Sequence, residues 1–406
     1  MHKQSVCVVG LGYIGLPTAA LLANHGYQVI GVDVNQHAVD TINAGRIHIV
    51  EPDLDAFVRS AVALGKLHAY TAPRAADVFI ICVPTPFHEG AGIPQPNIDY
   101  VLGATRSIAP SVKAGDLVIL ESTSPVGTTQ KMAEVLAQSG VDMSAVHVAY
   151  CPERVLPGKI MTELVENDRV VGGLTPKATE VVSAFYRTFV RGTVLETGAA
   201  CAEMCKLTEN SYRDVNIAFA NELSLLCANS GIDVWELILL ANRHPRVNIL
   251  QPGAGVGGHC IAVDPWFIVA RDPDNARLIR TAREVNNYKT EWVVDRIKVA
   301  VADAMVRKGS RPTIACLGLA FKPDIDDLRE SPALQIALTL QGQGYDLVAV
   351  EPNIETHPAL PLLDFEQAMA RADVIVVLVK HKAFLEPGAK AQLLQRGALD
   401  YCGATS

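Results

Sequence analysis

Short apolar runs alternate with helical stretches along the first 150 residues of the chain. The β-rich apolar runs occupy residues 5–9, 27–32, 78–83, 117–121 and 146–150. The first of them is followed by a helical pattern over residues 16–25. Strands that alternate with helices are typical of a parallel sheet covered by helices. This part of the chain therefore predicts an open α/β domain.

The middle of the chain follows a different pattern, because proline and glycine are absent from two long stretches. Residues 199–229 and 278–305 each predict one long helix, and residues 234–242 predict a shorter one between them. Apolar residues recur at helical spacing along these stretches. The middle block is therefore expected to be helical.

A second α/β pattern begins after the short basic segment 307–312. A helix is expected over residues 331–341. The strand-like runs lie at 313–319, 347–350 and 374–379. The sequence thus predicts an α/β protein with two Rossmann-like doubly wound domains joined by a long-helix central domain. The expected domains are 1–198, 199–306 and 307–406.

Composition narrows the partners and the compartment. The chain has 406 residues and a formal net charge of −8, and it has no basic tract, which argues against nucleic acid as a partner. No apolar run reaches the roughly 20 residues that span a bilayer, and no signal-peptide pattern opens the chain. Nine cysteines are scattered without zinc-type pairs, which predicts no metal site and a reducing, cytoplasmic compartment.

The segment GLGYIG follows the first predicted strand directly. Gly10 permits a tight turn, Gly12 lets a pyrophosphate approach the backbone, and Gly15 lets helix and strand pack closely. Asp33 ends the next strand, where its carboxylate would bind the adenosine ribose and repel a 2′-phosphate, so NAD is favoured over NADP. A glycine turn in an unrelated α/β fold is the alternative. The expected NAD-binding residues here are Gly10, Gly12, Tyr13, Ile14, Gly15 and Asp33.

Polar residues follow three later strands of the first domain. They are Thr85, Thr123 and Glu153. In an open parallel sheet, ligands bind beyond the carboxyl ends of the strands, so this shared position favours a functional role. Taken singly, each of these residues is more often solvated or capping.

A glycine-rich segment, PGAGVGGHCIAVDP, occupies residues 252–265. Its glycines exclude regular structure, and Asp264 before Pro265 is typical of a helix start with Asp at the N-cap. Cys260 is therefore expected in a tight loop before a helix N-terminus, where N–H groups and the helix dipole favour an anion such as a thiolate. A buried structural cysteine beside a capping Asp is the alternative.

Basic and amide side chains gather at two further places. Lys206 and Asn210 share a face of the first long helix with Arg213, although such a stripe is often only the solvated side. Lys322 and Arg329 follow the first strand of the second α/β domain, which has no glycine fingerprint. A nucleotide or nucleotide-sugar phosphate could bind there, and plain surface placement is the alternative.

Together these pieces resemble the UDP-glucose/GDP-mannose dehydrogenase family over nearly the whole chain. The matching segments are GLGYIGLP at 10–17, ESTSPVGTT at 121–129, CPER at 151–154, EMCKLTEN at 203–210, PGAGVGGHCIAVDP at 252–265 and GLAFKPDIDDLRES at 318–331. The resemblance implies that a sugar C6 alcohol is oxidised to the acid in two steps, with two NAD reduced.

The resemblance also implies the catalytic roles. Cys260 is expected to trap the aldehyde as a thiohemiacetal, which is oxidised to a thioester and then hydrolysed. Lys206 would hold the oxyanion, and Asn210 would orient water or substrate. Acid/base work in water activation falls to Asp264 and Glu153. Thr123 would help to position a water.

Further contacts and a homodimer, or a larger homo-oligomer, follow from the same resemblance. Arg246 is expected to reach the substrate site of the neighbouring subunit, because the long middle helix pairs with its copy in this family. Lys322 is expected at the nucleotide sugar. The expected substrate-binding residues are Glu153, Arg154, Lys206, Asn210, Arg213, Arg246, Gly257 and Lys322. The further NAD-binding residues are Thr85, Thr123 and Arg329.

Within the family, VGGHCIAVDPWF and HPRVNILQPG most resemble the members that oxidise UDP-N-acetyl-D-mannosamine to a uronate for bacterial surface polysaccharide such as enterobacterial common antigen. Members that oxidise UDP-glucose tend to carry Ser before the Cys and Lys before the Asp, where this chain has His259 and Val263. UDP-N-acetylglucosamine, which differs only at C2, and other UDP-sugars stay as alternatives.

Two other classes of protein remain as competing interpretations. A two-electron hydroxyacid dehydrogenase also joins a Rossmann domain to helices, but it would not require Cys260 or the C-terminal α/β domain. A non-catalytic NAD or nucleotide-sugar sensor would tolerate losses among Cys260, Lys206 and Asp264, and this chain has all three.

Overall fold

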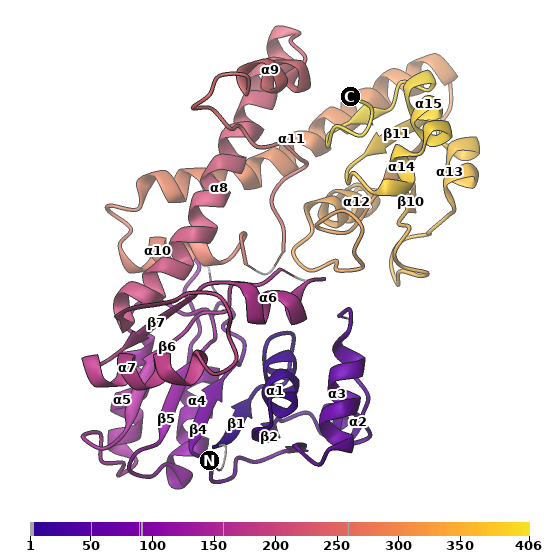
Figure 1. Ribbon diagram of the computed structural model, residues 1–406. Coiled ribbons are helices and arrows are strands. Elements are labelled where there is room, and N and C mark those ends of the chain that lie inside the picture. The colour runs from indigo at the N-terminus through magenta and orange to yellow at the C-terminus, as the bar shows by residue number, and fades with distance from the viewer. Residues whose placement is uncertain (1–3, 50, 89, 91, 157, 259) are drawn as a thin grey trace. The chain divides into compact units, whose positions relative to one another are not determined.

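The computed structural model of the chain describes residues 4–49, 51–88, 90, 92–156, 158–258 and 260–406. The chain forms two compact units, Met1–Thr208 and Glu209–Ser406, and the division falls inside a long helix (Figure 1). His259 lies outside the described residues. It is the residue before Cys260, where members that oxidise UDP-glucose tend to carry Ser. In the part of the chain that is described, no helix combines the length and apolar character needed to cross a membrane.

The first unit is built on one eight-stranded sheet in the order β3-β2-β1-β4-β5-β6-β7-β8. The strands are β1 (Ser5–Val9), β2 (Gln28–Val32), β3 (Leu67–Tyr70), β4 (Val78–Ile81), β5 (Leu117–Leu120), β6 (His147–Tyr150), β7 (Arg169–Gly173) and β8 (Val194–Gly198). Neighbouring strands are parallel except β6 and β7, which are antiparallel. The first six strands have the dinucleotide-binding order, whose topological switch point lies between β1 and β4.

Helices cover both faces of this sheet. They are α1 (Gly15–Asn24), α2 (Gln36–Asn43), α3 (Leu54–Ala63), α4 (Asp99–Ile108), the short η1 (Ala109–Ser111), α5 (Thr128–Gln138), α6 (Ile160–Glu166) and α7 (Pro176–Tyr186). Successive side chains of a strand point to opposite faces. Val6 and Val8 of β1 pack in the core with α1, α3, α6 and α7, whereas Cys7 and Val9 pack in the core with α4 and α5. The unit is therefore doubly wound.

The second unit joins long helices to a four-stranded parallel sheet in the order β10-β9-β11-β12. Its strands are β9 (Thr313–Leu317), β10 (Asp346–Val350), β11 (Val374–Val377) and β12 (Leu399–Asp400). The helices are α8 (Ala199–Ser230), which begins in the first unit, α9 (Val234–Ala241), α10 (Asp264–Arg271), α11 (Arg277–Lys308), α12 (Pro332–Gly342), α13 (Phe365–Arg371), α14 (Lys382–Leu385) and α15 (Pro387–Gln395). Val293 and Ile297 of α11 share one core with Ile314 and Cys316 of β9, so α11 covers one face of this sheet.

The predicted fold class is confirmed, with two α/β sheets and a long-helix region between them in the chain. The long helices expected over 199–229 and 278–305 run from Ala199 to Ser230 and from Arg277 to Lys308. The sequence pattern did not predict β3, β7, β8 or β12. The segments RVVGG and VLETG of β7 and β8 mix glycine and charged residues with the apolar ones. The three domain limits stay predictions.

Candidate active site

The glycine loop joins β1 to α1 at the switch point of the first sheet. Gly10 has a φ of +90°, a left-handed conformation that favours glycine, and its N–H donates to Val32 O at 2.8 Å. A Cβ on Gly15 would lie 1.7 Å from Gly10 O, so close packing excludes a side chain there. A Cβ on Gly12 would meet no described atom within 4 Å. The packing of the protein would therefore tolerate a side chain at position 12. Glycine is needed there for a pyrophosphate to approach the backbone closely.

Asp33 stands at the end of β2, beside this loop. Its half-buried carboxylate accepts hydrogen bonds from Leu11 N–H at 2.9 Å and from Asn35 N–H at 2.9 Å. One donor on each oxygen leaves lone pairs that a ribose diol could use. Tyr13 and Ile14 lie in the turn just before α1. The loop backbone, the helix N-terminus and the carboxylate together fit a bound NAD, with pyrophosphate at the helix and ribose at the acid.

The residues that follow β4 and β5 contact each other. Thr85 Oγ1 donates a hydrogen bond to Thr123 O at 2.6 Å. Because β4 lies next to β1 in the sheet, this contact lies at the carboxyl edge near the glycine loop. The shared position predicted for Thr85 and Thr123 is therefore found, while their roles toward NAD and water stay predictions.

Glu153 follows β6 and is buried in an ion pair that the sequence pattern did not reveal. Its Oε2 lies 2.7 Å from Nη1 of Arg169, the first residue of β7. Its Oε1 accepts a hydrogen bond from the Arg154 N–H at 2.6 Å. The Arg154 side chain donates from Nη1 to Asp168 O at 3.1 Å. The Glu153 carboxylate is thus fixed through both of its oxygens.

Three further titratable side chains, Cys82, Glu121 and Tyr186, lie close to this ion pair. Tyr186 Oη donates to Glu121 Oε1 at 2.6 Å, and Cys82 Sγ donates to Glu121 Oε2 at 3.3 Å. Burial raises the pKa of Glu121, and burial also takes the pKa of Cys82 well above its ordinary value. Sequence reasoning missed this group, although Glu121 opens the quoted segment ESTSPVGTT. We call the following side chains the carboxylate cluster: Cys82, Glu121, Glu153, Arg169 and Tyr186.

Glu203, near the start of α8, fixes the loop that carries Thr123. Its buried carboxylate accepts hydrogen bonds from Gly127 N–H at 2.6 Å, Thr129 N–H at 2.8 Å and Thr129 Oγ1 at 2.7 Å. An acidic side chain at a helix N-terminus satisfies N–H groups that have no partner within the helix. Glu203 lies about one helical turn before Lys206, so it ties the start of α5 to the part of α8 that carries this lysine. Glu203 lies in the segment EMCKLTEN, but no role was predicted for it.

In the second unit, Cys260 lies in a turn just before α10, as predicted. Its carbonyl accepts hydrogen bonds from Val263 N–H at 3.0 Å and Asp264 N–H at 2.8 Å. Asp264 Oδ2 accepts a hydrogen bond from Asn210 Nδ2 at 2.5 Å. Two of the predicted catalytic side chains, on α8 and α10, are therefore in direct contact, and the turn brings Cys260 close to them.

The predicted start of α10 is wrong by one residue. The helix begins at Asp264, with Val263 at the N-cap and Pro265 in the first turn, and Val263 forms no side-chain cap. The N–H of Asp264 is used by the preceding turn, because it donates to Cys260 O. The buried Asp264 carboxylate contacts Asn210 instead of acting as the N-cap.

The glycines before Cys260 are required because another loop packs against them. A Cβ on Gly257 would lie 2.4 Å from Glu330 O, so no larger residue fits without a shift. Gly258 has a φ of +84°, and a Cβ on it would lie 2.8 Å from the Phe321 ring. The segment predicted to bind substrate through Gly257 therefore lies against the loop that follows β9.

That loop carries Lys322 and Arg329. Lys322 is exposed. Arg329 Nη2 lies 2.6 Å from Asp327 Oδ2, and its Nε donates to Asp327 Oδ1 at 2.9 Å. Arg329 is thus engaged by a neighbour in its own loop. Both roles stay predictions.

A chain of buried polar side chains joins α8 to α11 and reaches the Cys260 loop. Asp214 Oδ1 accepts hydrogen bonds from Arg283 Nη1 at 2.6 Å and Asn286 Nδ2 at 2.8 Å. Asn221 Nδ2 donates to Asn286 Oδ1 at 2.8 Å, and Asn221 Oδ1 accepts from Gly253 N–H at 2.9 Å. Although the buried Asp214 Oδ2 and Arg283 Nε have no hydrogen-bond partner among the described residues, the Asn221 amide contacts both Asn286 of α11 and the backbone of Gly253. The start of the glycine-rich segment is therefore fixed to both long helices.

Two further predicted residues, Arg213 on α8 and Arg246 after α9, are exposed. Among the residues that the structure describes, neither guanidinium has a hydrogen-bonding or ionic partner. Lys206 is half-buried on α8. The structure is therefore compatible with anion binding by these side chains, and their roles stay predictions.

The turn after the first strand of the second sheet has the same geometry as the glycine loop. The acid at the position that corresponds to Asp33, however, is bound by other protein groups. Gly318 has a φ of +88°, and its N–H donates to Val350 O at 2.8 Å. Glu351 follows β10, accepts from Leu319 N–H at 2.7 Å and pairs with His381 Nε2 at 3.0 Å. Burial alone would raise the pKa of Glu351, but the hydrogen bonds from His381 and Leu319 lower it to about 2. This buried acid is engaged by the protein itself, so the geometry does not favour a second dinucleotide site.

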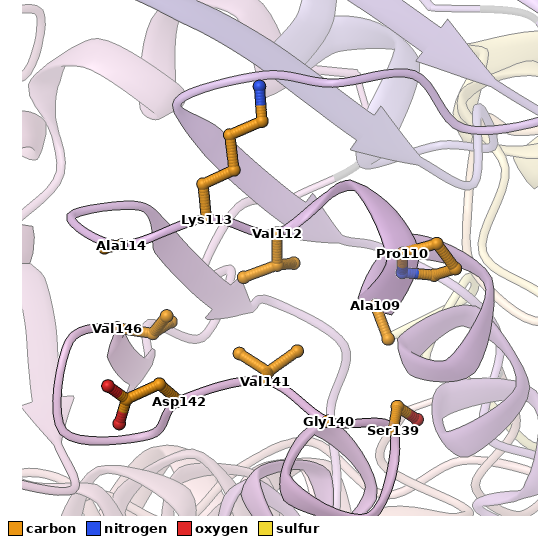
Figure 2. Close-up of a pocket in the computed structure, with 10 residues that line it drawn as sticks. All are labelled: Ala109, Pro110, Val112, Lys113, Ala114, Ser139, Gly140, Val141, Asp142 and Val146. Atoms are coloured by element: carbon orange, nitrogen blue, oxygen red, sulfur yellow. The ribbon is translucent and has the colours of Figure 1, made fainter.

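A cavity of about 270 Å³ lies at the end of the first sheet where β5 and β6 begin, and Figure 2 shows its lining residues. Lys113 and Asp142 are among them, and the lining comes from segments that precede β5 and β6. In open α/β sheets, ligands bind at the carboxyl ends of the strands. The cavity is therefore separate from the predicted site.

An open sheet in the dinucleotide-binding order, with a glycine loop at its switch point and an acid after β2, defines an NAD-binding α/β protein. The chain belongs to the UDP-glucose/GDP-mannose dehydrogenase family. It matches the NAD binding domain of that family over residues 4–190, the central domain over 200–288 and the UDP binding domain over 315–401. The protein is therefore an NAD-dependent nucleotide-sugar dehydrogenase.

Similar proteins cover nearly the whole chain. The chain is 59% identical over 402 residues to the UDP-N-acetyl-D-mannosamine dehydrogenase of Escherichia coli (strain K12), covering 95% of each protein. It is 58% identical over 395 residues to the NDP-N-acetyl-D-galactosaminuronic acid dehydrogenase of Ralstonia nicotianae, covering 94% of this chain and 92% of that protein. The solved structure of UDP-D-ManNAc dehydrogenase from Pyrococcus horikoshii matches with a TM-score of 0.88 and 37% identity, over 99% of this chain and 96% of that one.

Proposed function

We propose that the protein oxidises the C6 alcohol of UDP-N-acetyl-D-mannosamine to the uronate, with two NAD reduced per sugar. The observation that carries this proposal is the 59% identity, over 95% of both chains, to a UDP-N-acetyl-D-mannosamine dehydrogenase. The product would be a precursor of bacterial surface polysaccharide made in the cytoplasm. The contact of Asp264 with Asn210, next to the turn of Cys260, supports the chemistry.

The proposed reaction has two oxidations and one hydrolysis. When bound, NAD accepts a hydride from C6 in each oxidation. The alcohol first becomes an aldehyde and loses its hydroxyl proton. The Cys260 thiolate then adds to the aldehyde carbon, and the resulting thiohemiacetal loses the second hydride to become a thioester. Water adds to the thioester, and the carbon–sulfur bond breaks to release the carboxylate and the thiolate.

The side chains of the chain supply charge and proton acceptors for these steps. Lys206 would stabilise the oxyanion that forms whenever sulfur or water adds to the carbonyl carbon. Either Asp264 or Glu153 would take the proton from the attacking water. Asn210 would orient the Asp264 carboxylate, which it already contacts, and Thr123 would position the water.

A second candidate substrate follows from a specific observation. The chain is almost as similar, at 58% identity, to an enzyme named for N-acetyl-D-galactosaminuronic acid. A nucleotide N-acetylgalactosamine sugar therefore joins UDP-N-acetylglucosamine as an alternative. All these sugars keep the C6 alcohol, so the proposed chemistry does not distinguish them.

We also infer a homodimer formed through α8. Tyr212, Phe219 and Leu226 recur every seven residues on this helix, and each is more than half exposed. Such spacing makes one apolar stripe along a helix, which a second copy of the same helix could cover. The exposed Arg246 would then be available to a substrate in the partner subunit.

Steady-state assays of NADH production with a panel of sugars test the substrate. The panel contains UDP-N-acetyl-D-mannosamine, UDP-N-acetylglucosamine, UDP-N-acetylgalactosamine, UDP-glucose and GDP-mannose. We expect kcat/KM to be highest with UDP-N-acetyl-D-mannosamine. A markedly higher kcat/KM with another sugar would replace the proposed substrate, and no NADH with any of them would overturn the proposal.

A further inference from the structure

The carboxylate cluster places two acids and one base in the interior of the first unit. Glu121 is 2% exposed, Glu153 is 6% exposed and Arg169 is 2% exposed. The cluster forms where β4, β5 and β6 end, because Cys82, Glu121 and Glu153 each follow one of these strands. Arg169 enters from the neighbouring strand β7. Side chains far apart in sequence thus meet around Glu153, which is a proposed catalytic residue.

The charges of this cluster do not balance if both acids are ionised. Two carboxylates and one guanidinium would leave one negative charge buried, which is costly. Glu153 contacts the guanidinium directly, at 2.7 Å from Nη1. Glu121 instead accepts hydrogen bonds from Tyr186 Oη and Cys82 Sγ, which are neutral groups. The charge of Arg169 and the hydrogen bonds from Tyr186 and Cys82 favour the ionised form of Glu121, but burial outweighs them and raises its pKa, so Glu121 is the acid better suited to hold a proton.

Arg169 is itself held in a fixed position. Its Nη2 donates to Leu164 O, near the end of α6, at 3.1 Å. Its guanidinium also lies 5.7 Å from the centroid of the Tyr186 ring. A guanidinium fixed from α6 and α7 can hold a carboxylate in one orientation, because its N–H groups form a rigid fork. The remaining lone pairs of Glu153 stay available for a proton from water.

We propose that Arg169 is a positioning residue that keeps Glu153 ionised and oriented as a proton acceptor, while Glu121 holds the proton of the cluster. This inference rests on the proposed role of Glu153 in water activation. The role of Glu153 would then depend on the buried cation Arg169, which contacts it. It would not depend on whether Glu121 is ionised. The other titratable groups close to Glu153 are Cys82, Cys151 and Arg154, and Tyr186 contacts Glu121 and faces Arg169.

The pH dependence of kcat tests the proposal with the variant Arg169→Gln. Loss of a neighbouring cation raises the pKa of a carboxylate by about 1–3 units, so the acidic limb of the profile should move to higher pH by that amount. Activity lost at neutral pH should return as the pH rises, because Glu153 ionises again. A purely structural role would instead lower kcat by the same factor at every pH.

Two further variants keep the test decisive if Arg169→Gln does not fold. Arg169→Lys keeps the charge, so its acidic limb should stay at the pH of the unmodified protein even though kcat falls. Glu121→Gln replaces a protonated acid by a neutral amide of the same shape, so its profile should also keep its acidic limb. A limb that moves to lower pH in Glu121→Gln would show that Glu121 is charged, which overturns the proposal.

The variant Glu153→Gln separates this inference from the function on which it rests. If Glu153→Gln keeps full kcat, Glu153 is not the proton acceptor, and both the proposed role and the inference fail. If Glu153→Gln is slow but the acidic limb of Arg169→Gln does not move, only the inference about Arg169 fails. A slow Glu153→Gln variant together with a shifted limb in Arg169→Gln supports both.

Discussion

At the scale of single residues, Asp264 is the clearest candidate for the acid/base work of the second unit. It is buried, accepts a hydrogen bond from Asn210 and follows Cys260 within one turn of chain. A carboxylate has several lone pairs, so the hydrogen bond from the Asn210 amide leaves Asp264 able to accept a proton from a nearby water.

The variant Asp264→Asn tests this role. Loss of the proton acceptor should lower kcat by roughly 10²–10⁴-fold, the usual contribution of general acid–base catalysis. Asp274→Asn is a matched control, because Asp274 is exposed and precedes α11. The control should keep the kcat of the unmodified protein. An Asp264→Asn variant that is as active as the control would remove Asp264 from the mechanism.

Much of the candidate site could be predicted at this scale because its residues lie in local motifs. The glycine loop, Asp33, Cys260 and Asp264 each follow from a short segment whose backbone or chemistry has few alternatives. Arg169 and Glu121 could not be predicted in the same way. Their contacts join residues such as Arg169 and Glu153, or Glu121 and Tyr186, that only the sheet brings together.

At the scale of elements, the carboxylate of Glu203 joins α8 to the N-terminus of α5. Three hydrogen bonds converge on it, two of them from the backbone N–H groups of Gly127 and Thr129. The loop between β5 and α5 carries Thr123, and α8 carries Lys206. This junction therefore positions two proposed catalytic residues through a third that does no chemistry.

The variant Glu203→Gln should weaken this junction. Its amide nitrogen would face an N–H donor and leave a buried group unsatisfied, which costs about 1–3 kcal/mol. We expect a lower free energy of unfolding and a lower kcat. Glu222→Gln, at an exposed position of the same helix, is the control and should change neither. Equal stability of the two variants in urea unfolding would contradict this account of the junction.

The elements themselves were predicted well where periodicity was long or strict. The two long helices and the inner strands have patterns that tolerate few alternatives. Strands β7 and β8 were missed because their short segments mix glycine and charged residues with apolar ones and do not alternate cleanly. Of these two, only β8 is an edge strand, since β7 lies between β6 and β8. The start of α10 was misplaced because the turn at Cys260 already uses the N–H of Asp264.

At the scale of the whole molecule, the proposed dimer makes a prediction about shared sites. If Arg246 acts on the substrate of the partner subunit, hybrid dimers of Arg246→Ala and Cys260→Ala each contain one site with both residues intact. Mixing the two inactive variants should therefore restore part of the activity. Complete inactivity after verified subunit exchange would show that Arg246 does not act in the partner subunit.

The yield of NADH with a limiting amount of UDP-N-acetyl-D-mannosamine tests the central claim most directly. The claim is that one protein carries out both oxidations through a thioester on Cys260. It predicts two NADH and one uronate for every sugar consumed. It also predicts that Cys260→Ser accumulates an ester-linked sugar on the peptide that contains position 260, because an oxygen ester is a poorer acyl intermediate. One NADH per sugar with aldehyde released into solution, or full conversion to the acid by Cys260→Ala, would contradict the account.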